Sequence, residues 1–214
     1  MMCPFSFQNL SFIRAGFLDK EESLTFPQPI LMTQVHSADV IVLKEPPSGD
    51  LVCDALVTDY PDLKLTVKTA DCAPVLFVDE EKHIIGAAHA GWKGAFQGVM
   101  ENTVLKMISL GASVDKIKVA IGPHLTQKSF QVSESMQALF PKTEHLFFQE
   151  SDKGIYFDFT AYLKHRLNKI GIQNPEVFSL DTFSNKAYNS YRREPDNPAR
   201  QYSFIQLIKG ESHV

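Results

Sequence analysis

Three short segments of the chain each place a candidate metal ligand where an apolar run stops. The candidate ligands are His36 in QVHS, Cys72 in TADCAP and His89 in AHAGWKG. Zinc binds imidazole nitrogen and thiolate sulfur, and a catalytic zinc ion typically has three protein ligands and a fourth position open to water or substrate. Two imidazoles and one thiolate therefore match the number and type of donors that an open zinc site needs.

The spacing of these residues matches no local metal-binding pattern, so the three side chains can meet only through the fold. An isolated histidine is more often an ordinary surface or hydrogen-bonded residue, and an isolated cysteine in an apolar stretch is more often a small buried side chain. Taken one at a time, each of the three residues favours the structural interpretation over the metal-binding one.

A predicted β-hairpin brings two of the three residues together. Residues 73–78 and 84–88 are apolar and flank the polar segment DEEK at 79–82, so they predict two antiparallel strands with a short connection. Cys72 enters the first strand and His89 leaves the second. Both residues are therefore expected at the same end of the hairpin, without any long-range assumption.

The rest of the chain shows strand patterns interrupted by helical ones. Short apolar or β-branched runs predict strands, and apolar residues at helical spacing, with capping and stop residues, predict helices. Further strands are expected at 40–43, 54–58, 65–67, 117–121, 177–180 and 202–208, and helices at 95–110, 132–140 and 159–170. This grouping favours a single-domain α+β fold with mixed or antiparallel sheets over a regular doubly wound sheet. The polar, proline-rich residues 192–198 are expected to form a mobile loop.

The segment GWKG at 91–94 joins a predicted strand to a predicted helix. Free backbone N–H groups at a helix N-terminus, together with the side chain of Lys93, would suit a phosphate or a carboxylate. A tight turn with Trp92 packed beneath it is an equal alternative.

Length and composition restrict the class of protein. The 214 residues, 44% of them hydrophobic and 21% charged, fit one globular domain. The net charge of -4 comes without a block of like charges, so a nucleic-acid partner is not expected. No stretch has the apolar length of a membrane span or a signal sequence, so no membrane partner is expected either. Three cysteines without paired spacing favour a reducing compartment, and we expect the cytoplasm.

Taken together, the three ligand-bearing segments resemble the signature of the laccase-domain family, long named multicopper polyphenol oxidoreductases and later recognised as zinc-dependent purine nucleoside phosphorylases. The resemblance continues through DALVT, IGP, SYRR and RQ and covers most of the chain. It implies that residues 1–214 form one laccase-domain-like domain, with two packed sheets and helices on the outside. It also implies that His36, Cys72 and His89 bind zinc.

The chain departs from the family pattern at places away from the candidate ligands. RAGF at 14–17 replaces the usual Arg-x-Gly-Gly, and fewer residues than usual separate Arg14 from Gln34, which predicts a missing helical insert and a more open pocket. His124 stands where the family often has cysteine, and Asp181 replaces the cysteine of a Cys-Thr pair. These differences bear on substrate preference.

The resemblance implies phosphorolysis of adenosine, inosine, guanosine or methylthioadenosine, which is a pentosyl transfer, with hydrolytic deamination of adenosine as a companion activity. Phosphorolysis needs an anion-binding site beside the sugar and an acid or Lewis acid for the departing base. The candidate anion-binding residues are Lys93 with Gly91 and Gly94, and Arg14 from a distant segment. The expected partners are a purine nucleoside and phosphate, with zinc as the cofactor.

Two further polar residues adjoin the candidate ligands. Asp71 precedes Cys72 and is a candidate general acid or base. A carboxylate that hydrogen-bonds a ligand histidine or caps a turn is an equal alternative for Asp71. Gln34 lies two residues before His36, so in an extended segment both side chains face the same side, and Gln34 is a candidate substrate contact.

Three other functions remain open from the sequence. A polyphenol oxidase of the multicopper type would need roughly ten histidines, whereas the chain has seven. A thiol hydrolase or deamidase would use Cys72 as its nucleophile and His89 as its base, and the fold that the resemblance implies is similar to that of the cytotoxic necrotising factor deamidases. A non-enzymatic scaffold would bind a purine or a cell-wall precursor as a regulator.

Overall fold

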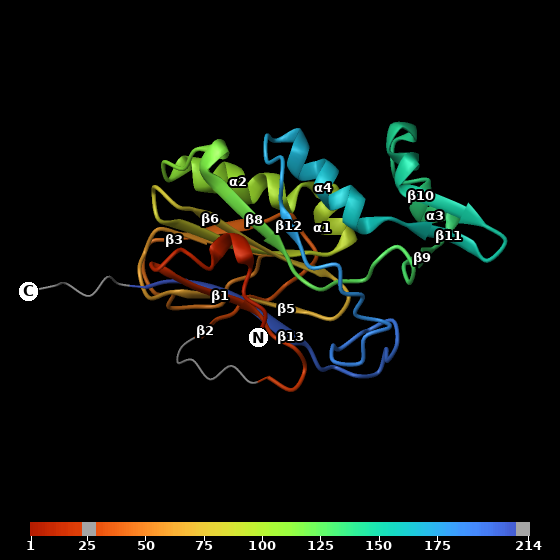
Figure 1. Cartoon of the computed structure of the whole chain (residues 1–214), viewed down its shortest axis with the longest axis horizontal. Helices are drawn as coiled ribbons and strands as arrows, with labels where there is room; N and C mark the ends of the chain where they lie inside the picture. The colour runs from red at the N-terminus through yellow and green to blue at the C-terminus, as the bar shows by residue number, and fades with distance from the viewer. Residues whose placement is uncertain (23–28, 209–214) are drawn as a thin grey trace, which may run out of the picture.

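The computed structural model describes residues 1–22 and 29–208 and has three layers (Figure 1). Helices cover one face of a six-stranded sheet, and a four-stranded sheet covers its other face. One apolar core lies between the helices and the six-stranded sheet, and a second core lies between the two sheets. The fold is therefore α+β with mixed sheets and outer helices, as predicted.

The six-stranded sheet contains β3 (Val40–Leu43), β4 (Ala55–Thr58), β6 (Ala73–Asp79), β7 (Ile84–Ala90), β8 (Ile117–Ile121) and β12 (Glu176–Val177). The strand order is β12-β8-β6-β7-β4-β3. Its centre is the antiparallel hairpin of β6 and β7, in which Ala73 pairs with Ala90 and Pro74 pairs with His89. Every residue of both strands is buried because both faces of the sheet are covered.

The four-stranded sheet contains β1 (Ile13–Phe17), β2 (Pro29–Ile30), β5 (Lys64–Thr69) and β13 (Gln201–Leu207) in the order β1-β13-β5-β2. Strand β13 pairs antiparallel with both β1 and β5. Its first residue, Gln201, pairs with Thr69, the last residue of β5. The residues that follow β5 in the sequence lead directly into β6, so this end of the sheet faces Cys72.

The helical layer contains α1 (Trp92–Gln97), α2 (Val99–Ser109) and α4 (Phe159–Lys169). Helix α4 begins after Asp158, whose carboxylate accepts a hydrogen bond from the N–H of Ala161 at 2.9 Å, as expected for an N-cap. A small sheet and a short helix extend from one end of the molecule (Figure 1). The small sheet consists of β9 (Gln131–Val132), β10 (Phe148–Ser151) and β11 (Gly154–Phe157), and the short helix is α3 (Glu134–Gln137). Elsewhere in the described chain, short 3-10 helices span Phe5–Phe7, Val114–Lys116 and Lys142–Phe147.

The sequence predicted one continuous helix over residues 95–110. The structure has two helices there, so the prediction of a single helix was wrong. Gly98 separates α1 from α2 and has a φ of 101°, a left-handed conformation. Its N–H donates to the carbonyl oxygens of Gly94 and Ala95, which closes α1. The apolar pattern gave no sign of the break, because both helices bury their apolar residues in the same core.

Two other predicted elements are shorter than expected. Of residues 132–140, only Glu134–Gln137 form a helix, since Val132 pairs with Ile155 in the small sheet. Of the strand predicted at 177–180, only Val177 remains, in a two-residue strand with Glu176. At Val132 a tertiary strand pairing replaced the helical turn that the local pattern favoured.

Within the described residues, no helix combines the length and apolar character needed to cross a membrane. The three cysteines Cys3, Cys53 and Cys72 are all free. The cytoplasmic location inferred from unpaired cysteines stays a prediction.

We predict that Gly98→Ala lowers the free energy of unfolding by about 1–2 kcal/mol, because alanine resists the left-handed conformation that Gly98 adopts. Gly49→Ala is the matched control, since a Cβ atom there meets nothing within 4 Å and Gly49 has no positive φ. The control should change stability by less than about 0.5 kcal/mol. Equal effects of the two substitutions in urea unfolding would show that the left-handed conformation at residue 98 does not penalise alanine.

Candidate metal centre

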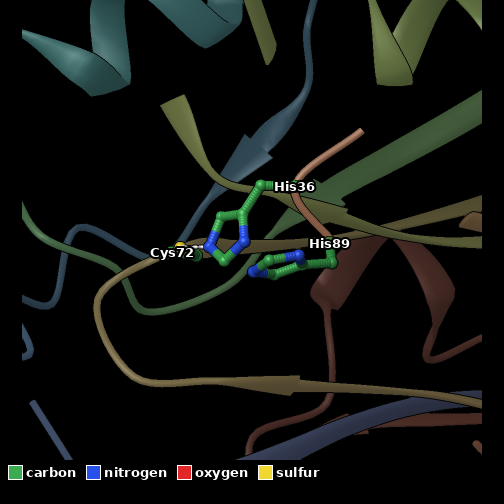
Figure 2. Close-up of side chains that lie close together, drawn as sticks. All are labelled: His36, Cys72 and His89. Atoms are coloured by element: carbon green, nitrogen blue, oxygen red, sulfur yellow. Dashed lines mark hydrogen bonds between the residues drawn. The ribbon is translucent and has the colours of Figure 1, made fainter. Parts of the chain in front are cut away.

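The side chains of His36, Cys72 and His89 converge in the structure (Figure 2). Each offers one ligand atom, and these atoms all lie within 4.8 Å of one another. The sulfur of Cys72 is 3.8 Å from Nε2 of His36. The two imidazole rings lie edge to face, with centroids 4.9 Å apart. The three donors therefore form one cluster, although they come from three separate segments.

The hairpin and two glycines set the positions of the three donors. Cys72 directly precedes β6 and His89 lies near the end of β7, at the same end of the hairpin, as expected. A Cβ atom on Gly91 would lie 2.8 Å from Cδ2 of His36 and 3.1 Å from the sulfur of Cys72. A Cβ atom on Gly94 would lie 2.7 Å from the carbonyl oxygen of Ser37. Both glycines are needed so that the loop carrying His36 can approach α1 this closely.

The carboxylate of Asp54 connects this loop to β7. It accepts hydrogen bonds from the backbone N–H groups of Val35, His36 and Ser37 at 3.2, 3.0 and 2.7 Å, and from the Ser37 hydroxyl at 2.9 Å. It also lies 2.8 Å from Nδ1 of His89. Asp54 is fully buried. Because Asp54 occupies Nδ1, Nε2 is the nitrogen of His89 that remains for a ligand.

The charges in the cluster favour a thiolate at Cys72. Burial by itself would raise the pKa of Cys72, but the charge of His89 and hydrogen bonds with His36 and His89 lower it to about 6. Burial would lower the pKa of His89, but Cys72 and Asp54 raise it to about 9. Burial would raise the pKa of Asp54, but hydrogen bonds from His89 and Ser37 lower it to about 2. A thiolate is the form of cysteine that binds metals and acts as a nucleophile.

A cavity of about 900 Å³ opens beside the cluster. Its wall contains both aromatic rings, which can stack on a planar ligand, and cationic side chains, which can bind an anion. The lining residues are Thr33, Gln34, His36, Lys68, Thr69, Ala70, Asp71, Cys72, His89, Trp92, Leu125, Phe130, Phe159, Tyr191, Arg192, Pro195, Pro198 and Arg200. The three donors thus face a space large enough for a small organic substrate.

Asp71 lines the cavity and holds the opposite loop. One carboxylate oxygen accepts a hydrogen bond from the hydroxyl of Thr182 at 2.7 Å, and the other accepts one from the backbone N–H of Arg192 at 2.7 Å. The φ of Asp71 is 87°, in the left-handed region. These bonds correspond to the turn-capping alternative, and the role of Asp71 as general acid or base stays a prediction.

Gln34 also lines the cavity, but its amide is engaged. Its Nε2 donates to the carbonyl oxygen of Lys68 at 2.8 Å, and its Oε1 accepts from the N–H of Lys68 at 2.8 Å. This pair of bonds attaches the loop carrying His36 to β5. The observed contacts of Gln34 are therefore those of a residue that positions the loop.

The structure does not bring Lys93 and Arg14 together at the cavity. Lys93 is exposed, and its Nζ lies 5.7 Å from the centroid of the Trp92 ring. Arg14 lies on β1 at the edge of the four-stranded sheet and lines a separate cavity of about 200 Å³. The anion site expected from these two residues is therefore not assembled, because the pairing of β1 with β13 places Arg14 elsewhere.

Several residues of the site were not predicted from the sequence. Asp54 carried one signal, since it is a charged residue at the start of a strand that is otherwise apolar. Arg192 and Arg200 belong to the segments SYRR and RQ of the family resemblance but were given no role, and Lys68 carried no signal. Only the fold shows that these three residues line the cavity. The expected mobile loop at 192–198 supplies part of the cavity wall instead.

Comparison with known proteins gives consistent matches. The family model described as multi-copper polyphenol oxidoreductase laccase matches residues 17–208. A purine nucleoside phosphorylase of Rickettsia prowazekii is 33% identical over 196 residues, covering 87% of this chain and 81% of that protein. The purine nucleoside phosphorylase YfiH of Escherichia coli is 33% identical over 188 residues, covering 85% of this chain and 74% of that protein.

Solved structures show the same fold. A protein of Neisseria meningitidis is similar with a TM-score of 0.77 and 28% identity, covering 85% of this chain and 76% of that one. YlmD from Geobacillus stearothermophilus is similar with a TM-score of 0.76 and 27% identity, covering 85% of this chain and 74% of that one. From the cluster, the fold and these matches together, the chain belongs to the family described as multi-copper polyphenol oxidoreductase laccases.

Proposed function

We propose that this chain is a zinc-dependent purine nucleoside phosphorylase that acts on adenosine, inosine, guanosine or methylthioadenosine, with adenosine deamination as a companion activity. The observation that carries the proposal is the convergence of His36, Cys72 and His89 on a cavity with aromatic and cationic walls. The names of the relatives in Rickettsia prowazekii and Escherichia coli support it.

The donor set fits a zinc ion. Nitrogen and sulfur ligands at about 2.0–2.3 Å from a tetrahedral ion lie about 3.5 Å apart, and the sulfur of Cys72 is 3.8 Å from Nε2 of His36. A bound zinc ion would supply a Lewis acid at the cavity wall. His36, Cys72 and His89 would hold it, and Asp54 would orient His89 through Nδ1.

The cavity wall also fits the proposed substrates. Trp92, Phe130, Phe159 and Tyr191 line it and offer aromatic surface to a purine base. Asp71 lines it beside Cys72, and we propose this carboxylate as the group that exchanges a proton with the departing base.

The thiol hydrolase is a second candidate, and a specific geometry favours it. Cys72, His89 and Asp54 form a chain in which the carboxylate orients the imidazole and the imidazole faces the sulfur. A cysteine nucleophile with a histidine base and a third orienting group has this arrangement. The position of His36 favours the metal site instead, because a thiol enzyme has no need of a second imidazole 3.8 Å from its sulfur.

The remaining alternatives have less structural support. In the described part of the chain, the histidines outside the cluster make separate local contacts with Phe12 (His83), Gly122 and Thr160 (His124), Phe140 (His145) and Phe147 (His165). His213 lies outside the described residues. A multicopper centre would require clustered histidines. A non-enzymatic scaffold is distinguished from an enzyme by the turnover assay below.

We expect the protein with about one zinc ion per chain to convert adenosine and phosphate into adenine and ribose 1-phosphate in equal amounts. Inosine and hypoxanthine in the same mixture would report deamination. Removal of the metal with a chelator should abolish turnover, and added zinc should restore it. A metal-free protein that keeps full activity and loses it on treatment with iodoacetamide would contradict the metal mechanism and support the thiol enzyme.

We predict that Cys72 of the metal-free protein reacts with iodoacetamide at an unusually low pH. The reactive thiolate accumulates as pH rises through the pKa, so the rate should rise around pH 6 and level off above about pH 7. Cys3 and Cys53 serve as internal controls, because burial raises the pKa of both thiols, that of Cys53 to about 11. A labelling midpoint near the ordinary thiol value of about 8.5 would contradict the geometry of the cluster.

We predict that Asp54→Asn weakens zinc binding about 10- to 100-fold, because the orienting carboxylate of His89 is lost. Asp39→Asn is the matched control, since Asp39 is an exposed carboxylate of the same loop. Competition with a chelator of known affinity measures the effect. Unchanged zinc affinity in a folded Asp54→Asn protein would show that Asp54 acts only on the fold.

A further inference from the structure

Among the described residues that line the cavity, the cationic side chains outnumber the carboxylates. Lys68, Arg192 and Arg200 carry positive charge, and Asp71 is the acidic residue. The ion pairs found in the described part of the chain include none of the three cationic residues. The chain as a whole has a net charge of -4. The cavity therefore concentrates positive charge in an acidic protein and attracts anions.

The three cationic residues gather around one short segment, residues 68–71. Lys68 belongs to this segment and lies on β5. Arg200 directly precedes Gln201, which pairs with Thr69. The backbone N–H of Arg192 donates to the carboxylate of Asp71. Three segments that are distant in sequence thus meet at the stretch that leads into Cys72.

We propose that Lys68, Arg192 and Arg200 form the subsite that binds the phosphate co-substrate, in place of Lys93 and Arg14. This inference rests on the proposed phosphorylase function. Phosphate is the anion that phosphorolysis requires in the same cavity as the nucleoside. Guanidinium groups match its geometry, because their planar N–H groups bind two oxygens at once.

Local contacts hold the two guanidinium groups without neutralising them. Nη1 of Arg192 donates to the carbonyl oxygen of Ser129 at 3.1 Å, and its Cζ lies 5.6 Å from the centroid of the Phe130 ring. Nη1 of Arg200 donates to the carbonyl oxygens of Asn197 and Ala199 at 3.2 and 2.8 Å. Carbonyl oxygens carry no net charge, so the positive charge and the other N–H donors remain for an oxyanion.

The loop that carries Arg192 is itself anchored. The guanidinium of Arg193 donates to the carbonyl oxygens of Thr182, Phe183 and Tyr188 at 2.8, 2.8 and 2.6 Å. Together with the bond from Arg192 to Asp71, these bonds fix the loop against the cavity. An anion site on a fixed loop loses less conformational freedom on binding than a site on an unattached loop.

The test compares Michaelis constants for phosphate and for the nucleoside in the zinc-loaded enzyme. Arg200→Gln and Lys68→Gln should each raise the KM for phosphate about tenfold or more and change the nucleoside KM by less than about twofold. Arg200→Lys should recover part of the loss because it keeps the charge. Lys164→Gln, at an exposed position of α4, is the neutral control.

Two kinetic outcomes would overturn the inference. The first is an unchanged phosphate KM in both Arg200→Gln and Lys68→Gln. The second is a phosphate-specific loss in Lys93→Gln, which would return the assignment to the turn at Gly91 to Gly94.

A binding measurement separates failure of this inference from failure of the proposed function. Trp92 lines the cavity and is the single tryptophan of the chain, so its fluorescence reports anions that enter. Titration of the zinc-loaded protein with inorganic phosphate should give a saturable change that weakens about tenfold in Arg200→Gln. Phosphate binding without turnover of any nucleoside would refute the phosphorylase and keep the anion site. Absence of saturable binding, or equal binding by wild type and Arg200→Gln, would refute the anion site.

Discussion

The buried carboxylate of Asp54 is the interaction on which the geometry of the site depends. A buried charge is costly unless hydrogen bonds compensate it. Here three successive backbone N–H groups, one hydroxyl and the imidazole of His89 surround it. Because these donors come from both the loop of His36 and β7, the carboxylate is satisfied only when the two segments are together. The need to compensate one buried charge thus holds two of the three candidate ligands, His36 and His89, close to each other.

Hydrogen bonds to carboxylates also hold two residues of the site in strained backbone conformations. His36 and Asp71 both have positive φ values, 61° and 87°. Such conformations cost about 1–3 kcal/mol each and persist where surrounding contacts enforce them. Asp54 receives the N–H of His36, and the side chain of Asp71 holds Thr182 and Arg192. In both cases the strained residue turns its side chain toward a cavity that regular strands would not reach.

The residues of the site come from two kinds of structure, the buried central hairpin and the loops at its end. The hairpin of β6 and β7 is buried along its whole length and supplies Cys72 and His89 at one end. The loops supply His36, Arg192 and Arg200, together with Phe130 and Tyr191 of the aromatic wall. Two bonds between the Gln34 amide and the backbone of Lys68 attach the loop of His36 to β5. The guanidinium of Arg193 instead holds its own loop together. The family description refers to copper and polyphenols, but the donors that converge here are two imidazoles and one thiolate.

The sequence by itself determined the parts that depend on neighbours along the chain. Alternating and continuous apolar runs predicted the central hairpin, and with it the meeting of Cys72 and His89. Capping chemistry predicted α4 behind Asp158. The pattern also led to the α+β class, and the three segments led to the family.

Only the tertiary structure decided which charges face the cavity. The pairing of β13 with β5 and the bond from Asp71 to Arg192 bring Lys68, Arg192 and Arg200 there, while β1 carries Arg14 to another cavity. The apolar pattern likewise did not predict the break between α1 and α2 at Gly98, because the helical spacing of apolar residues continues through it. The physical reason is the same in each case. Local patterns record which residues are buried, whereas long-range pairing sets which polar side chains meet.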